Sequence, residues 1–323
     1  MSTVAGIDIA KATFDIATLH PNGKYHTKGK LTNNDSGFEA LRVWLGKHTE
    51  PDAWIVMEAT GVYHEPLAEY LYERGYRVCV VNPACIKKYG ESRLQRVKTD
   101  KIDSKLIALY GVTHLGQLKA WKPVAPAYRR LRALVRRLED LQEMVQMERN
   151  RVGVSEASVR PLVQAMIAQI EQQIAETLKA IKQHIDDDPD LRNKRDLLVS
   201  IQGISDRTAS LLLAEQGDPL QYKDGRALVA FAGLNPKLQE SGKHRGHVTI
   251  SRMGSARLRA GLYMPAVTAL TYNPAITALK KRLEAKGKAG KQIVCAAMRK
   301  LLHIAYGVLK SGQPFDARLA IAR

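Results

Sequence analysis

The chain has 323 residues, of which 45% are hydrophobic and 25% are charged, as in ordinary globular proteins. This length suffices for two compact domains with connecting helices. No apolar run is expected to approach the length needed to cross a bilayer, and the first apolar stretch already contains Asp8, so neither a membrane protein nor a secreted one is predicted.

The positive charge is concentrated at one end of the chain. Lys and Arg number 50 against 32 Asp and Glu, a net charge of +18. Residues 191–323 hold 23 of these bases and 8 of the acids, so +15 of the excess lies in the last segment. Such one-sided charge favours a nucleic-acid partner, since phosphates attract it. A basic surface without a specific partner is the alternative, and the bases form no amphipathic membrane anchor.

Three cysteines, Cys79, Cys85 and Cys295, form no CxxC pair. An odd number of thiols without metal-ligand spacing predicts neither a disulfide framework nor a zinc site. We therefore expect buried thiols in a reducing cytoplasm.

The first third alternates strand-like and helix-like stretches. Strands are expected at 4–10, 14–19, 24–31, 53–59 and 77–83, and helices at 36–47, 64–74, from about 84 to 98, and 100–114. Three strands in a meander, followed by alternating strand and helix, predict a mixed α/β sheet with helices on both faces. That is the element order of a ribonuclease H-like fold.

The remainder is predicted to be helical. Leu131, Leu138 and Val145 belong to a run of apolar residues at steps of three and four, which indicates a coiled-coil seam. A second apolar run, from 167 to 185, completes a helical arm that serves either as a spacer or for dimerisation. The expected domains are therefore an α/β domain at 1–118, a coiled-coil arm at 119–190 and a mainly α, basic domain at 191–323.

Four carboxylates are candidates for a metal site. Asp8 lies within an apolar strand, where an uncompensated charge is costly, and Glu58 ends the fourth strand. Asp100 and Asp103 are one helical turn apart. In a ribonuclease H-like sheet the first and fourth strands are neighbours, so all four would converge and need Mg²⁺, for which Mn²⁺ can substitute. Two such ions suit phosphodiester chemistry. Alternatively, Asp100 is a helix cap and Asp103 an exposed acid, while Asp15 belongs to the polar phase of its strand.

A basic loop at 237–257 contains candidate nucleophiles. Ser241 lies between Glu240 and Gly242 and is followed by basic residues. A serine hydroxyl attacks only when its proton is removed and the attacked phosphate is neutralised. On the residues alone, a simple hydrogen bond from Ser241 to a phosphate is the stronger interpretation, and Ser251 and Ser255 are rival candidates.

Other residues are predicted to contact nucleic acid. The segment VSIQGISDRTASLLLAE (199–215) resembles a helix-hairpin-helix, which presents backbone amides to a phosphate, although its usual second glycine is replaced. The predicted contacts are Gly203, Ser205, Arg207, Lys243, Arg245, Arg252 and Arg257. A purely structural turn is an equal alternative for the first three.

The motifs together resemble a known family. GIDIAK, EATGVYHEPL, VNPACIKKY and KTDKIDSKLIA are similar to the N-terminal domain of the DEDD transposases of the IS110 insertion-sequence family. The likeness continues through GISDRTASLLLAE, AFAGLNPKLQESGKHRG, LYMPA and AYGVLKSG, and so covers nearly the whole chain in order. An actin-like sugar kinase also begins with a GID strand, but its further glycine-rich loops and second half are missing.

The resemblance implies a prokaryotic recombinase that acts on the nucleoid. It implies a RuvC-like domain whose four acids match Asp8, Glu58, Asp100 and Asp103, and a catalytic serine that matches Ser241 and holds DNA as a phosphoserine. It further implies DNA partners (element ends and target), a structured guide RNA, and a homodimer or homotetramer. The alternatives are a metal-dependent nuclease that hydrolyses with water and a non-catalytic nucleic-acid-binding protein.

Overall fold

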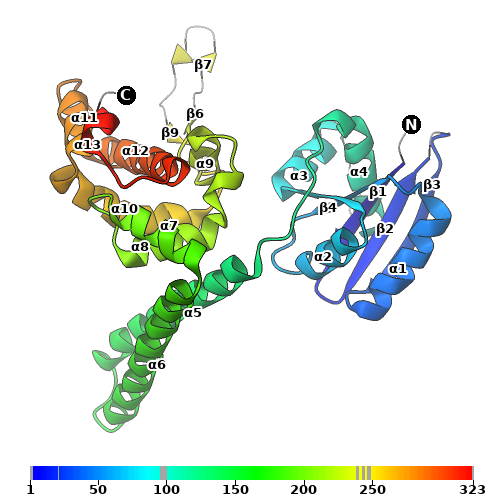
Figure 1. Cartoon of the computed structure of the whole chain (residues 1–323). Coiled ribbons are helices and arrows are strands. Elements are labelled where there is room, and N and C mark those ends of the chain that lie inside the picture. The colour runs from blue at the N-terminus through cyan, green and yellow to red at the C-terminus, as the bar shows by residue number, and fades with distance from the viewer. Residues whose placement is uncertain are drawn as a thin grey trace. The chain divides into compact units, whose positions relative to one another are not determined.

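A computed structural model describes residues 3–20, 22–94, 100–237, 240–241, 244–245 and 249–321. The chain divides after Pro123 into two compact units (Figure 1). The first unit holds the strands β1 (Val4–Ile9), β2 (Thr13–Leu19), β3 (Tyr25–Thr32), β4 (Trp54–Glu58) and β5 (Arg77–Val81), and the helices α1 (Asp35–His48), α2 (Glu65–Glu73), α3 (Pro83–Ser92) and α4 (Asp100–Thr113).

The five strands form one mixed sheet in the order β3-β2-β1-β4-β5. β2 is antiparallel to β1 and β3, whereas β1, β4 and β5 are parallel. The predicted mixed α/β domain is therefore confirmed. Most element bounds lie close to those expected from the sequence, but α3 ends at Ser92, earlier than the helix predicted to reach 98.

Helices cover both faces of this sheet (Figure 1). Ala5, Ile7 and Ile9 of β1 share one buried cluster with residues of α1 and α2. Val4 faces the other way and clusters with Val56 of β4 and Ile107 of α4. Because side chains alternate along a strand, Gly6 and Asp8 share the face of Val4, beneath α4.

Gly6 lets α4 lie directly on the sheet. A Cβ at this position would stand 2.1 Å from the amide nitrogen of Ala108 and 2.5 Å from the carbonyl oxygen of Ser104. Both atoms belong to the α4 backbone, which cannot move aside as a flexible side chain would. The small residue two places before Asp8 thus fixes how closely α4 approaches β1.

We expect Gly6→Ala to destabilise the first unit by about 1–3 kcal/mol, the usual cost of overpacking a core. Gly46→Ala is the matched control, because nothing lies within 4 Å of a Cβ at that position in α1. The control should stabilise the unit by about 0.5–1 kcal/mol through helix propensity. Urea unfolding followed by circular dichroism measures both. Equal stability of Gly6→Ala and the wild type would contradict the close packing.

The second unit is mainly helical, as predicted. Its helices are α5 (Pro126–Val152), α6 (Arg160–Asp187), α7 (Pro189–Val199), α8 (Asp206–Gln216), α9 (Gly225–Phe231), α10 (Ala256–Tyr272), α11 (Pro274–Glu284), α12 (Gly290–Ser311) and α13 (Ala317–Ile321). α5 and α6 pack as an antiparallel hairpin, in which Arg149 pairs with Glu171. Leu131, Leu138 and Val145 are buried. The supercoiled geometry of a coiled coil and a separate domain at 119–190 stay predictions.

A buried lysine ties the base of the hairpin to the rest of this unit. The side chain of Lys194 in α7 is 10% exposed, and its Nζ donates to Tyr128 of α5, at 2.7 Å from the hydroxyl oxygen. It also donates to Asp190 at 2.8 Å and to Asp218 at 3.1 Å. These carboxylates compensate the buried charge, and the pKa of Lys194 is raised by its hydrogen bonds to Asp190, Tyr128 and Asp218, which outweigh the opposing effect of burial.

Two expectations need correction. By length and composition alone, α12 could cross a membrane, contrary to the sequence prediction. However, 61% of its most apolar stretch is buried in the second unit, as in a core helix of a folded domain. The three cysteines are free thiols, but only Cys79 is buried, whereas Cys85 is exposed.

Candidate active site

Asp8 and Glu58 are neighbours at the carboxyl ends of two parallel strands. The register pairs Gly6 with Val56 and Ile7 with Met57, so the next residues along the two strands are Asp8 and Glu58. Adjacent strands lie about 4.8 Å apart. Glu58 shares its face with Val56, which clusters with Val4 beneath α4. Asp8 and Glu58 therefore occupy adjacent positions on the same face of the sheet.

The beginning of α4 lies toward the same end of β1. A Cβ on Gly111 would contact Val4 and Val56, whereas Gly6 abuts Ser104 and Ala108. The helix thus runs antiparallel to β1, and its first turns extend past Gly6 toward Asp8. Asp100 and Asp103 belong to these turns.

The side chain of Asp100 lies outside the described residues. Within the described part of the chain, no three His, Cys, Asp or Glu side chains are arranged to hold a metal ion. The backbone brings together the elements that carry the four acids, and the convergence of the four carboxylates stays a prediction.

Asp15 of β2 lies directly opposite Asp8. It is therefore closer to Asp8 than its assignment to the polar phase of its strand suggested. Its carboxylate leans over Gly29 of β3, with Oδ1 only 2.3 Å from where a Cβ would be. Oδ2 accepts a long hydrogen bond, 3.4 Å, from the amide of Lys30. The register of β2 and β3 shifts at this point. The Asp15 carboxylate therefore binds the backbone where the pairing of these strands is irregular.

Asn33 joins the loops that follow β1 and β4, a role that the sequence analysis missed. Its Nδ2 donates to the carbonyl of Ala10 at 3.2 Å and to that of Tyr63 at 3.0 Å. Its backbone amide donates to Ala12 at 2.9 Å. One amide side chain thereby links the segments that follow Asp8 and Glu58. An asparagine after a strand is common in turns, so the sequence offered no distinguishing signal.

His64 immediately precedes α2, at the start of the helix expected over 64–74, and its side chain is buried with an unpartnered Nδ1. Burial lowers the pKa of His64 below its usual value, against the opposing effects of Glu65 and of the Thr60 and Gly61 backbone. The imidazole is therefore neutral near pH 7.

This shift predicts an acid-sensitive first unit. Because the folded state holds His64 with a lowered pKa, its stabilising contribution is complete above the unfolded pKa of about 6.5 and is lost as the pH falls through the folded pKa. We expect His64→Gln to lose less stability than the wild type between pH 7.5 and pH 5.5 in urea unfolding. His48, whose pKa is also lowered, remains in both proteins. Identical pH profiles would contradict the buried neutral histidine.

Ser241 lies in a β-hairpin rather than in an irregular loop. β6 (Pro236–Lys237) pairs with β9 (Thr249–Ile250), and β7 (Glu240–Ser241) pairs with β8 (His244–Arg245). Ser241 stands opposite His244. Their side chains and that of Arg245 lie outside the described residues, as does Lys243 altogether. The backbone thus places Ser241 at the end of β7, paired with β8.

The two rival serines differ in their partners. The Ser255 hydroxyl caps α10 by accepting the amide of Leu258, and it donates to Glu215, at 3.1 Å from Oε2. Ser251 is held through its backbone amide, which donates to Asn235 at 2.8 Å. Ser255 therefore has a structural role that accounts for its hydroxyl.

The predicted helix-hairpin-helix turn joins α7 to α8. Gly203 has φ +103°, and a Cβ there would stand 2.8 Å from Cβ of Ala269, so this glycine allows α10 to approach. Ser205 caps α8 by accepting the amide of Thr208 at 3.4 Å. Arg207 donates to the side-chain oxygen of Gln142 in α5.

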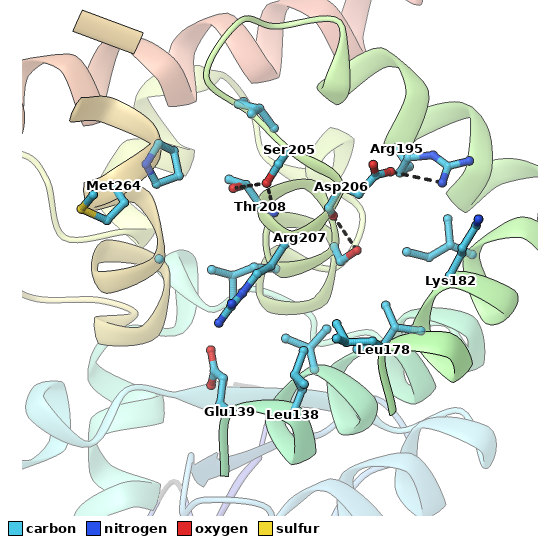
Figure 2. A pocket seen from close by; sticks show the side chains of 18 of the residues that line it. Leu138, Glu139, Leu178, Lys182, Arg195, Ser205, Asp206, Arg207, Thr208 and Met264 are labelled. Carbon is cyan, nitrogen blue, oxygen red and sulfur yellow. Dashed lines mark hydrogen bonds and ion pairs between the residues drawn. The ribbon is translucent and has the colours of Figure 1, made fainter. Parts of the chain in front are cut away.

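These residues line a groove of about 1230 Å³ within the second unit. Figure 2 shows Ser205 beside Thr208 at the beginning of α8, and the side chain of Arg207 directed toward Glu139 of α5. The lining includes three acids, Glu139, Asp186 and Asp206, and three bases, Lys182, Arg195 and Arg207. The charges in the groove thus balance, and Arg195 pairs with both Asp186 and Asp206. Phosphate contacts by Gly203, Ser205 and Arg207 stay predictions.

Arg252 and Arg257 lie at the base of the hairpin and in the first turn of α10. Arg252 is exposed and has φ +54°. Arg257 forms an ion pair with Glu139 of α5. To contact a phosphate, the side chain of Arg257 therefore has to leave Glu139. For Arg252, no ion pair is found in the described part of the chain.

Comparisons with known proteins agree along the whole chain. Residues 5–153 match a DEDD family of IS110 elements described as "Transposase", and residues 195–281 match the family "Transposase IS116/IS110/IS902". The chain is 35% identical over 321 residues to the pilin gene-inverting protein of Moraxella bovis, covering 98% of each chain. It is 24% identical over 347 residues to the transposase for insertion sequence element IS1328 of Yersinia enterocolitica, covering 97% of this chain and 98% of that one.

The mixed-sheet domain, the basic helical unit and these relatives define a DNA transposase or recombinase. The chain belongs to the IS110/IS116/IS902 transposase family.

Proposed function

We propose that the protein cuts and rejoins DNA through a metal-dependent acidic site and a serine nucleophile. The observation that carries the proposal is the register of β1 and β4, which starts Asp8 and Glu58 side by side on the face beneath α4. The strand order β3-β2-β1-β4-β5 supports a ribonuclease H-like, RuvC-type domain.

The donor set suits divalent cations. Carboxylate oxygens are the ligands that Mg²⁺ and Mn²⁺ prefer, and adjacent like charges such as Asp8 and Glu58 favour a cation between them. Asp8, Glu58, Asp100 and Asp103 would hold the ions. When bound, the metal supplies charge neutralisation at the phosphate and lowers the pKa of a coordinated oxygen.

Ser241 supplies the nucleophile in this proposal. The serine hydroxyl loses its proton and its oxygen forms a bond to phosphorus, while the bond between phosphorus and the sugar oxygen breaks. The released sugar oxygen takes up a proton and becomes a hydroxyl, so the step balances. A free hydroxyl of another strand then attacks the phosphoserine, restores the serine and closes the new phosphodiester. One ester is exchanged for another at each step, so no ATP is needed.

The partners follow from charge and exposed surface. The excess of +15 in residues 191–323 supports binding to DNA phosphates, with Lys243, Arg245, Arg252 and Arg257 as proposed contacts. Guidance by a structured RNA rests on the family resemblance alone. Exposed apolar side chains near the tip of the arm, Met147, Val154 and Leu162, support self-association through the arm.

A metal-dependent nuclease that hydrolyses with water is the second candidate, since the acidic positions serve it equally well. Incubation of the protein with labelled DNA carrying the element's ends, RNA transcribed from its flanks and Mg²⁺ separates the two. A covalent protein–DNA adduct on a denaturing gel supports the serine mechanism. Cleaved DNA without any adduct supports the nuclease. Binding without cleavage, unaffected by EDTA, supports a non-catalytic binding protein.

A further inference from the structure

The segment that carries Ser241 is a hairpin, residues 231–255, whose base is closed by backbone hydrogen bonds. The amide of Ser255 donates to Phe231 at 2.8 Å, and the amide of Arg252 donates to Gly233 at 3.0 Å. The pairs β6/β9 and β7/β8 continue toward Ser241. We call this segment the serine hairpin.

Arg259 of α10 connects the two sides of the base. Its Nη1 donates to the carbonyl of Ala232 at 3.0 Å on one side, and to those of Gly254 at 3.2 Å and Ser255 at 3.3 Å on the other. A guanidinium is planar, always charged and rich in donors, so one side chain can hold several carbonyls in fixed positions. Arg259 is half-buried here rather than extended into solvent.

The neighbouring residues are shaped for this guanidinium. A Cβ on Gly233 would stand 2.6 Å from Nη1 of Arg259, and a Cβ on Gly254 would stand 2.1 Å from the carbonyl oxygen of Phe231. Both glycines have positive φ, +67° and +142°, which L side chains rarely adopt. The base therefore requires glycine at both positions, and Arg259 fills the space that Gly233 leaves.

A second contact fastens the same base to the arm helices. Ser255 donates to Glu215 of α8, whose side chain is 7% exposed and accepts a hydrogen bond from Arg136 of α5 at 3.3 Å. The base of the serine hairpin is thus joined to α5, α8 and α10. A purely flexible loop would not need such a buried, charged connection.

We propose that Arg259 is a positioning residue that fixes the direction of the serine hairpin and thereby the place of Ser241. Ser241 follows Gly233 by eight positions along this segment, so a change in the direction of the base displaces β7, which carries Ser241. A misplacement of about 1 Å can cost about 100-fold in rate. The proposal rests on the proposed function of Ser241.

The test compares Arg259→Gln and Arg259→Lys with Arg318→Gln, in which an exposed arginine of α13 is changed in the same way. Adduct formation is timed at saturating DNA, and DNA affinity is measured separately by fluorescence anisotropy. We expect Arg259→Gln to slow adduct formation about 10- to 100-fold with affinity changed less than twofold. Arg259→Lys, which keeps the charge and some donors, should recover part of the rate. Arg318→Gln should match the wild type.

Limited trypsin digestion of the free protein gives a readout without catalysis. Cleavage after the Lys and Arg residues of the serine hairpin should be about tenfold faster in Arg259→Gln, at an unchanged melting temperature. If Arg259→Gln does not fold, Gly233→Ala displaces the guanidinium while keeping it, and should give the same two effects.

Wild-type rates of both adduct formation and digestion in Arg259→Gln would overturn the proposal. A loss of affinity as large as the loss of rate would overturn it too, because Arg259 would then be a DNA contact. An adduct that persists in Ser241→Ala defeats the proposed function instead, and faster digestion of Arg259→Gln would then still show that Arg259 holds the hairpin.

Discussion

Replacing Ser241 with alanine is expected to abolish the covalent protein–DNA adduct, with a fall of at least about 1000-fold in its rate of formation. Alanine has no hydroxyl to attack phosphorus, and the neighbouring bases and acids cannot supply one. The backbone pairing of β7 with β8 does not depend on the serine side chain, so the hairpin should persist. The measurement is the yield of labelled adduct on denaturing gels after incubation with Mg²⁺.

Ser251→Ala provides the matched control, because it removes a hydroxyl from the other side of the same hairpin. Ser251 is held by its backbone amide, which this change leaves intact. The control should keep wild-type adduct formation, and both variants should bind DNA as tightly as the wild type. If Ser241→Ala cleaves DNA at the wild-type rate and no protein forms an adduct, the serine is not the nucleophile and the hydrolytic nuclease is the better description.

The sequence predicted the first unit more fully than the second. Strands such as Val4–Ile9 are short, mostly apolar runs bounded by polar or turn residues, and each is long enough to be recognised. Turn residues and caps then set the bounds of the helices between them. The place of Asp8 on a buried strand followed from this pattern, because a carboxylate among apolar residues stands out.

The serine hairpin was predicted only as a basic loop. Its strands are two residues long, such as Pro236–Lys237, too short for alternation to be recognised, and its pairing depends on residues far along the chain. Arg259 lies two residues beyond that loop, and its hydrogen bonds to three carbonyls of the hairpin base were not foreseen. The charge of an arginine is evident from the sequence. Whether its N–H groups donate to backbone carbonyls or to water is not. The same limit hid Asn33, whose partners come from two loops that are distant in sequence.

Replacing Asp8 with asparagine is expected to lower adduct formation and cleavage by at least about 1000-fold while leaving the fold intact. Asparagine has nearly the shape of aspartate but carries no charge, so it is a poor ligand for Mg²⁺. Thermal unfolding with and without Mn²⁺ measures binding apart from catalysis. The wild type should be stabilised by the ion, and the variant should gain much less from it.

Asp15→Asn tests whether the metal response depends on Asp8 itself or on any carboxylate close to it. Asp15 stands directly opposite Asp8, but its carboxylate leans over Gly29 and accepts the amide of Lys30. Its replacement should therefore keep the metal-induced stabilisation and at least about a third of the wild-type adduct rate, because the long hydrogen bond to Lys30 contributes at most about 1 kcal/mol. If Asp8→Asn kept the response to Mn²⁺ while Asp15→Asn lost it, the acidic site would be centred on β2 and β3. The register of β1 and β4 would then no longer support the proposed mechanism.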